Sequence, residues 1–483
     1  MTSLIGAVTA LLDDAIGAYA GSPAAGRLEA ARARLDEPLR VAVAGKVKAG
    51  KSTLLNALVG ERLAPTDAGE CTRVVTWYVG SHTSRVTLHP RVGDAAQAPF
   101  RRDDGAITVD LGGRSTRDVD HLVVEWPSPR LVDVSLIDTP GIDSLSNDVS
   151  ARSYAFLTPG DDHETLADAV VYLMRHLHSS DVRFLEAFHD DEVVQATPVN
   201  AIGVLSRADE IGVGRLDAMD TATRIAGRYR TDPLVRRVCQ TVVPVAGLLA
   251  ETASTLRQDE FAAVARLTSA SEADLDSALL SADRFADGAS HLPVDAAERA
   301  ALLRRLGLYG VRLSISLVRT GTCRTGPELA AELRRTSGIE RLEAVLRSQF
   351  AHRRDLLKAR AGMAALDAVL RDLPDERLAI ALERLEASAH ELTELRLLNA
   401  LAAGALALDE DGSAARLLGA AGPGARARLG LDDSAGEAEV REAVATEIAR
   451  WHRRAEHPMA SREEVEAARV LIRTCEGLLA LSA

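Results

Sequence analysis

Short runs rich in apolar residues recur through the first half of the chain, and each has the length of one buried strand. The runs occupy residues 41–44, 132–137, 201–205 and 242–246, and each is followed by a glycine or a polar residue. Runs of this kind are typical of parallel strands that are covered on both faces. They predict an α/β domain over residues 37–250.

Three more strand patterns lie between the first two of these runs. Residues 84–89, 106–111 and 121–126 are rich in β-branched and aromatic residues, which are common in strands. They lengthen the interval beyond that of a minimal nucleotide-binding domain. We therefore expect an enlarged mixed sheet with flanking helices.

The two ends of the chain have helical spacing instead. Residues 1–36 carry apolar residues at intervals of three and four, and the pattern from 251 to 483 is helical almost throughout. These regions predict N-terminal helices that pack on a neck, followed by an all-α bundle of neck and short trunk. Ser337 and Glu340 have the spacing of a capping box, ahead of a helical pattern that continues to Leu373 and stops at Pro374.

Composition excludes several classes of protein. Apolar residues make up 47% of the 483 residues and charged residues 26%, so a disordered chain is excluded. The net charge of −13 argues against a nucleic-acid partner. Four widely spaced cysteines, no apolar run of membrane-spanning length and no basic leader predict a cytoplasmic protein.

Lysine is rare in this chain. The 57 basic residues include only four lysines, at positions 46, 48, 51 and 358. Three of the four therefore fall within six residues, where a chemical requirement is a better explanation than surface charge.

These three lysines belong to a phosphate-binding loop. Gly45-x-x-x-x-Gly50-Lys51-Ser52 follows an apolar strand and precedes a helical pattern, which is the context this motif requires. Lys51 would reach the β- and γ-phosphates, and Ser52 would bind Mg²⁺. The residues expected to contact the nucleotide here are Gly45, Lys46, Val47, Lys48, Ala49, Gly50, Lys51, Ser52 and Thr53.

Three later segments favour GTP over ATP. Asp138-Thr-Pro-Gly141 ends a strand, so Asp138 would hold Mg²⁺ through water and the Gly141 N–H would face the γ-phosphate. Ser206-Arg207-Ala-Asp209 resembles the guanine-reading signature, in which Asp209 accepts from guanine N1–H and N2–H₂ and the Arg207 plane covers the base. Ala246 and Gly247 lie where the loop that caps the base belongs. Each motif alone also fits an ordinary turn at a strand end.

A switch threonine that binds Mg²⁺ must lie between the phosphate loop and Asp138. Thr72 is the favoured candidate, because it lies in a loop just before a strand. Thr76 fits better as a β-branched strand residue, and Thr66 is a weaker third candidate. Lys48, Lys51 and Thr72 are thus the expected catalytic residues, and Ser52, Thr72 and Asp138 the expected metal ligands.

The enlarged sheet and these motifs resemble the dynamin superfamily. Gly-x-Val-Lys-Ala-Gly-Lys-Ser in the phosphate loop, Glu125-Trp-Pro, Ser206 to Gly212 and Trp451 to Pro458 are similar to the isoniazid-inducible dynamin-like GTPases of actinobacteria. The resemblance implies Mg²⁺-dependent hydrolysis of GTP to GDP, coupled to movement of the helical region for membrane remodelling or envelope maintenance. It also implies nucleotide-dependent self-association through the GTPase domain.

Two positions depart from the dynamin pattern. Val47 and Lys48 replace polar loop residues that orient water and a cation, and Ile142 leaves no Ras-type glutamine after the Asp-Thr-Pro-Gly segment. Slow basal hydrolysis is therefore expected. The Lys48 ammonium would supply the charge of a monovalent cation; alternatively it points to solvent or to Asp67.

Membrane contact and cellular role stay open. Residues 397–422 contain an Ala/Leu-rich run that fits either a lipid-dipping tip or, preferably, a bundle helix with its loop. The possible partners are an anionic membrane at the inner face of the plasma membrane and a related dynamin-like protein. The alternatives to membrane remodelling are a soluble switch GTPase for a protein partner and a GTP-dependent scaffold with little hydrolysis.

Overall fold

The structure is a computed structural model. It describes residues 3–65, 74–103, 105–140, 167–175, 200–288, 291–350, 353–402, 406–409, 411–422 and 424–481.

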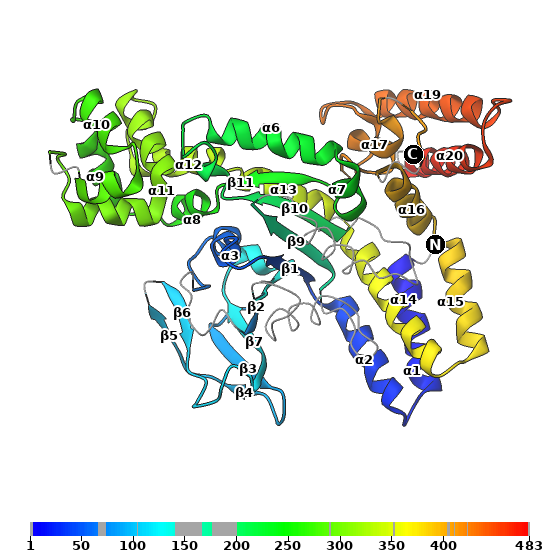
Figure 1. The fold of residues 1–483 in the computed structure, drawn as a ribbon. Helices are drawn as coiled ribbons and strands as arrows, with labels where there is room; N and C mark the ends of the chain where they lie inside the picture. Colours follow the sequence, from blue (N-terminus) through cyan, green and yellow to red (C-terminus); the bar gives the residue numbers. More distant parts are fainter. Residues whose placement is uncertain are drawn as a thin grey trace.

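A mixed sheet forms the centre of the molecule (Figure 1). Its nine strands follow the order β11-β10-β9-β1-β8-β2-β7-β3-β4. Strands β8, β1, β9, β10 and β11 pair in parallel, β2 pairs antiparallel with β8 and parallel with β7, and β3 pairs antiparallel with β7 and β4. The strands are β1 (Leu39–Gly45), β2 (Val75–Gly80), β3 (Arg85–Pro90), β4 (Ala96–Gln97), β7 (Val119–Trp126), β8 (Val134–Asp138), β9 (Ala169–Met174), β10 (Ala201–Ser206) and β11 (Val242–Val245).

The predicted enlarged sheet is confirmed, and every predicted strand segment except 106–111 lies in it. Strands β1, β9 and β10 are buried along their whole length, which explains their continuous apolar sequence. The segment at 106–111 forms a separate hairpin instead of joining the main sheet, with β5 (Phe100–Asp103) paired to β6 (Ala106–Val109).

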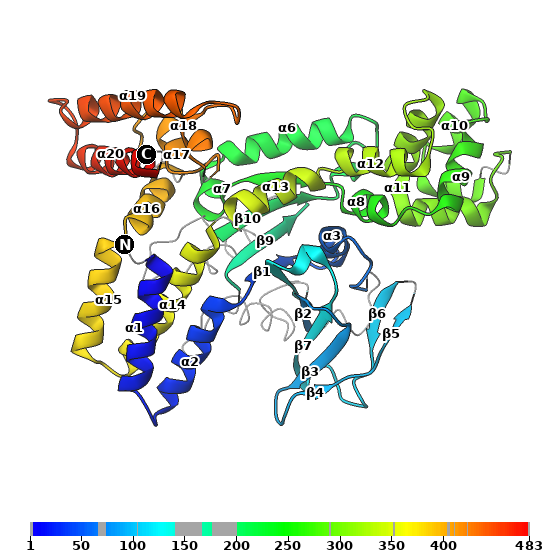
Figure 2. The same ribbon diagram turned by 180° about the vertical axis from the view of Figure 1, so that it is seen from behind.

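Helices cover both faces of the parallel strands. On one face, α3 (Lys51–Val59), α8 (Gly247–Thr255) and α13 (Ile339–Gln349) place Leu54, Ala250 and Ile339 in one core with the strands. On the other face, α6 (Ala218–Thr231) and α7 (Pro233–Val238) pack through alanine and valine side chains. The sheet is therefore the middle layer of three, as Figure 2 shows from behind.

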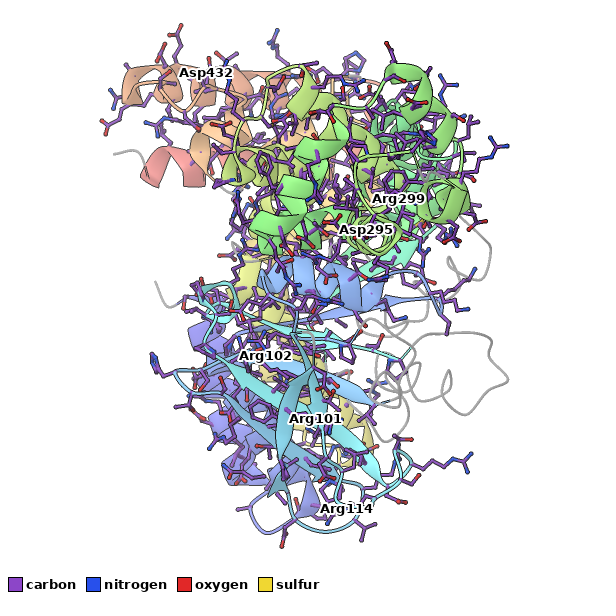
Figure 3. All side chains as sticks on the ribbon, turned by 90° about the vertical axis from the view of Figure 1, so that its left-hand side faces the viewer. Arg101, Arg102, Arg114, Asp295, Arg299 and Asp432 are labelled. Atoms are coloured by element: carbon purple, nitrogen blue, oxygen red, sulfur yellow. The ribbon has the colours of Figure 1, made fainter. Side chains whose placement is uncertain are left out.

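A helical lobe follows α8 at one end of the sheet. We define the lobe as α9 (Gln258–Leu267), α10 (Glu272–Ala278) and α11 (Ala296–Arg319), which share a core with α12 (Gly326–Thr336). Asp295 caps α11 by accepting from the Glu298 N–H at 2.8 Å. Arg299 is buried and donates to the carbonyls of Phe285, Ala286 and Val294, so it fastens the lobe internally (Figure 3).

A second helical group joins the N-terminal helices to two helices from the later part of the chain, and we call it the neck. It contains α1 (Leu4–Ala18), α2 (Pro23–Asp36), α14 (Arg354–Asp372) and α15 (Glu376–Ser388), which pack around one apolar core. The remaining helices form a third group, namely α16 (His390–Ala402), α17 (Ser413–Leu417), α18 (Ala425–Leu429), α19 (Glu437–Ala455) and α20 (Arg462–Leu481).

The chain after residue 250 is thus helical as expected, but its helices make several separate packing groups. The lobe and the third group lie at opposite ends of the sheet in both views, and α13 is part of the sheet's own covering layer (Figures 1 and 2). The boundaries at residues 36 and 250 stay predictions.

The expectation of one continuous helix from Ser337 to Leu373 is wrong. The pattern is split between α13 and α14, because α13 packs on the sheet while α14 packs on the N-terminal helices. Ser337 is not an N-cap either: it ends α12, and Gly338, at φ 80°, begins α13.

The described part of the segment 397–422 lies in the core of the third group. Leu397, Leu398, Leu408, Leu417 and Leu418 are all buried there. This packing favours the bundle interpretation over the lipid-dipping tip. Within the described residues, none of the helices combines the length and the apolar character that crossing a bilayer requires.

Candidate functional site

The phosphate loop joins the end of β1 to the start of α3. Gly45 has φ 147°, and a Cβ at this position would lie 2.5 Å from the Leu173 carbonyl oxygen, so only glycine fits beside β9. Gly50, at φ 95°, is the N-cap of α3. Lys48 is also left-handed, at φ 61°, and is exposed at the loop together with Val47.

Lys51 folds back over this loop. Its Nζ donates to the carbonyl oxygens of Gly45 at 3.1 Å and Lys46 at 3.2 Å, and the residue is buried. The charge is therefore held at the mouth of the loop, where the N-terminus of α3 also favours an anion.

Ser52 and Asp138 meet across the loop. The Ser52 hydroxyl donates to Asp138 Oδ2 at 3.0 Å, which places the two predicted metal ligands side by side. Burial raises the pKa of Asp138 to about 6, although Lys51 and the Ser52 hydrogen bond act to lower it. Asp138 Oδ1 is buried without a hydrogen-bond partner in the described part of the chain. A hydroxyl and a carboxylate with a spare buried oxygen fit a hydrated Mg²⁺, which would favour the charged form of Asp138.

The segment predicted to read guanine, Ser206 to Asp209, turns sharply at the end of β10. Arg207 has φ 50°, and its guanidinium pairs with Glu210 at 2.8 Å. Asp209 is buried, and burial raises the pKa of its carboxyl to about 6. The Ser206 hydroxyl donates to the Met174 carbonyl at 3.3 Å, which ties this turn to β9.

The predicted base-capping segment, Ala246 and Gly247, lies next to the start of α3. Gly247 begins α8 directly after Ala246, and a Cβ at Gly247 would lie 3.7 Å from Thr53 Cγ2 and 3.9 Å from the Leu54 nitrogen. The carboxyl ends of β1, β8, β10 and β11 thus bring their loops to one edge of the sheet, the usual ligand position in an open α/β sheet.

Three predicted positions lie outside the described residues: Thr66, Thr72 and Gly141. Thr76 is described, and it lies in β2 with its hydroxyl donating to the Val74 carbonyl at 3.2 Å. Thr76 is therefore a strand residue, as its sequence context indicated. The role of Thr72 as metal ligand stays a prediction.

A buried charge cluster, which the sequence analysis did not identify, lies at the other end of β1. Asp168 precedes β9 and has a fully buried side chain; it pairs with Arg34 Nη2 of α2 at 3.0 Å and with Lys358 Nζ of α14 at 3.0 Å. The Arg40 backbone N–H donates to the same carboxylate at 2.8 Å. This Asp168 cluster therefore connects the sheet to the neck. Its sequence signal was Lys358, the fourth lysine of a lysine-poor chain.

Comparisons with known proteins agree with this geometry. The dynamin family matches residues 41–206, a span that includes the phosphate loop, Asp138 and Ser206. The chain is 43% identical to the isoniazid-induced protein IniC of Mycobacterium tuberculosis, over 98% of either chain. The bacterial dynamin-like protein of Nostoc punctiforme is 33% identical over 147 residues, which are 28% of this chain and 20% of that protein. This chain therefore belongs to the dynamin family, and it is similar to IniC along almost its whole length.

Proposed function

We propose that the protein binds GTP with Mg²⁺, hydrolyses it to GDP and phosphate, and couples the nucleotide state to movement of its helical groups. The observation that carries the proposal is that Lys51, the Ser52–Asp138 pair and Asp209 all follow the carboxyl ends of parallel strands, at one edge of the sheet. Phosphoryl transfer needs mainly positioning and compensation of charge, and these residues supply both.

Each residue has a distinct role in this proposal. Lys51 compensates charge on the β- and γ-phosphates, while Ser52, Asp138 and Thr72 hold the metal ion. The bound Mg²⁺ neutralises charge that develops on the phosphate oxygens. Asp209 selects guanine, and the backbone at Ala246 and Gly247 covers the base. The Asp168 cluster gives the sheet a rigid connection to α2 and α14, through which movement reaches the neck.

We propose membrane remodelling or envelope maintenance as the cellular role, with the protein in the cytoplasm or peripheral on the inner face of the plasma membrane. Self-association through the GTPase domain and contact with anionic lipid or a related dynamin-like protein belong to this role. A soluble switch GTPase is the second candidate, favoured by the buried leucines of the described segment 397–422.

The test is GTP turnover as a function of protein concentration, with and without anionic liposomes. Turnover per molecule that rises with concentration and with lipid supports the membrane role. Turnover that ignores lipid supports the soluble switch, and tight GTP binding without turnover supports a scaffold.

Asp209→Asn is expected to exchange guanine selectivity for xanthine selectivity. The carboxylate accepts two hydrogen bonds from guanine, whereas the amide can pair with the carbonyl at position 2 of xanthine. GTP affinity should fall by about 100-fold and xanthosine triphosphate affinity should rise. Titration calorimetry measures both, with the exposed neighbour Glu210→Gln as the control. If the wild-type protein binds ATP as tightly as GTP, the assignment of Asp209 as the guanine-selecting residue is wrong.

Lys48→Ser is expected to lower kcat far more than it weakens GTP binding. The exposed ammonium at the phosphate loop would otherwise supply the charge that a bound monovalent cation supplies in relatives, and this charge acts mainly in the transition state. We expect a fall in kcat of about 100-fold, similar wild-type rates in sodium and potassium, and partial rescue of the variant by potassium. Lys48→Arg keeps the charge and serves as the control. A strong potassium requirement in the wild type, or an unchanged kcat in the variant, would contradict this role.

A further inference from the structure

The loop after the guanine-reading aspartate has an unfavourable backbone conformation. Gly212, Val213 and Gly214 are consecutive left-handed residues, at φ 64°, 61° and 65°. A β-branched residue such as Val213 is rarely found there, and its side chain is 72% exposed, so burial does not compensate for the strain. A strained turn of this kind persists only where neighbouring groups hold it.

Arg312 of the helical lobe holds this turn. Its Nη1 donates to the carbonyl oxygens of Val213 at 3.2 Å and Gly214 at 2.6 Å. Its Nη2 donates to the Leu279 carbonyl within the lobe. One charged side chain therefore fastens the loop that carries Asp209 to helix α11.

The kink in α11 lies against the same loop. Gly307 breaks the helix with φ 65° and ψ 174°, a region that essentially only glycine occupies. A Cβ at Gly307 would lie 3.6 Å from Asp209 Oδ2 and 3.7 Å from Leu248 Cδ2. A Cβ at Gly214 would lie 3.2 Å from the Tyr309 nitrogen, so the two backbones are in direct contact.

Helix α11 also contacts α8, the helix that begins at the segment proposed to cap the base. The Thr252 hydroxyl donates to the Arg305 carbonyl, and Arg305 Nη2 donates to the Thr255 carbonyl at 2.9 Å. A Cβ at Gly310 would lie 2.8 Å from Leu249 Cδ1. Residues 305–312 therefore contact the loop that carries Asp209 and also α8, the helix that directly follows Ala246.

We propose that α11 braces the guanine pocket, with Arg312 and Gly307 as positioning residues that set how long a guanine nucleotide stays bound. This inference rests on the proposed function, since it assigns the base to the Asp209 and Ala246 segments. Dissociation of the base requires the two segments to separate, and the lobe opposes this separation. The phosphate loop is outside the brace, so its affinity for phosphate groups does not depend on Arg312.

Arg312→Ala tests the brace in the full-length protein. We expect fluorescent mant-GDP to dissociate about tenfold faster, because a charge-assisted contact with two carbonyls is lost. Binding of inorganic tripolyphosphate should stay within about twofold of the wild type, because this ligand has no base. Arg319→Ala is the matched control: Arg319 lies on the same helix and donates to the carbonyls of Thr268 and Ala270 inside the lobe, away from the base.

A second substitution separates bracing from general loss of stability. Val213→Gly makes the left-handed turn favourable without Arg312, so the double variant Arg312→Ala/Val213→Gly should recover most of the slow dissociation. Equal dissociation rates in Arg312→Ala and Arg319→Ala would overturn the brace, as would parallel losses of mant-GDP and tripolyphosphate binding. A wild-type protein that binds tripolyphosphate but shows no preference for guanine would instead overturn the proposed function.

Discussion

Replacing Lys51 with alanine is expected to abolish tight GTP binding and turnover. The Lys51 ammonium is held over the phosphate loop by the carbonyls of Gly45 and Lys46, so it is placed to meet the β- and γ-phosphates. Its loss removes the main side-chain charge that is aimed at these phosphates. We expect GTP affinity to fall by at least about 100-fold, measured by isothermal titration.

Lys48→Ala is the matched control for this result. It removes an equal charge from the same loop, three residues away, but from an exposed position. GTP should therefore still bind to this variant with an affinity close to that of the wild type. Near-normal affinity in the Lys51 variant would defeat the assignment of the phosphate site.

Replacing Asp168 with asparagine is expected to destabilise the fold by about 3–5 kcal/mol. The substitution keeps the shape of the side chain but removes the negative charge between Arg34 and Lys358, and the Lys358 side chain is only 1% exposed. Burial already lowers the pKa of Lys358, while Asp168 acts to raise it. A buried ammonium without its counter-charge is strongly unfavourable, so urea and thermal unfolding should both shift to milder conditions.

Asp372→Asn provides the control at the same junction. Asp372 of α14 pairs with Arg27 of α2 at 2.7 Å, but both side chains are substantially exposed. Loss of this ion pair should therefore lower the free energy of unfolding by less than about 1 kcal/mol. Adding Lys358→Met to Asp168→Asn should restore part of the lost stability. Equal effects of the two aspartate substitutions would show that burial of the Asp168 cluster contributes little.

Local sequence predicted the phosphate loop and most of the sheet well, because burial on both faces imposes a continuous apolar sequence on β1 and β10. Strand β9 is equally buried and apolar, but it was not predicted. The prediction failed where one continuous helical pattern belongs to two helices that pack on different parts of the fold. Nothing in the spacing of residues 337–373 marks the division between α13 and α14, since each half is amphipathic but faces a different neighbour.

Local sequence patterns did not predict contacts between residues that are far apart in the chain. Arg312 meets the carbonyl of Gly214 across 98 positions, and Arg34 meets Asp168 across 134. The composition did mark Lys358, but its partner became clear only from the fold. The roles of Thr72 and Gly141 stay predictions.

The neck is built from helices that are far apart in the sequence, and this also constrains the order in which the protein folds during synthesis. Helices α1 and α2 are made well before their partner α14, which begins at Arg354, and the Tyr19 hydroxyl donates to the Leu373 carbonyl, 354 positions later. At ribosomal speeds of about 5–20 residues per second, the delay is on the order of 20–60 s. During this time Val8, Leu12 and Ala15 can pack on α2, but they lack the apolar side chains of α14 that complete their core in the finished molecule. The nascent chain therefore keeps part of this apolar helix face uncovered until α14 has been made and the neck is complete.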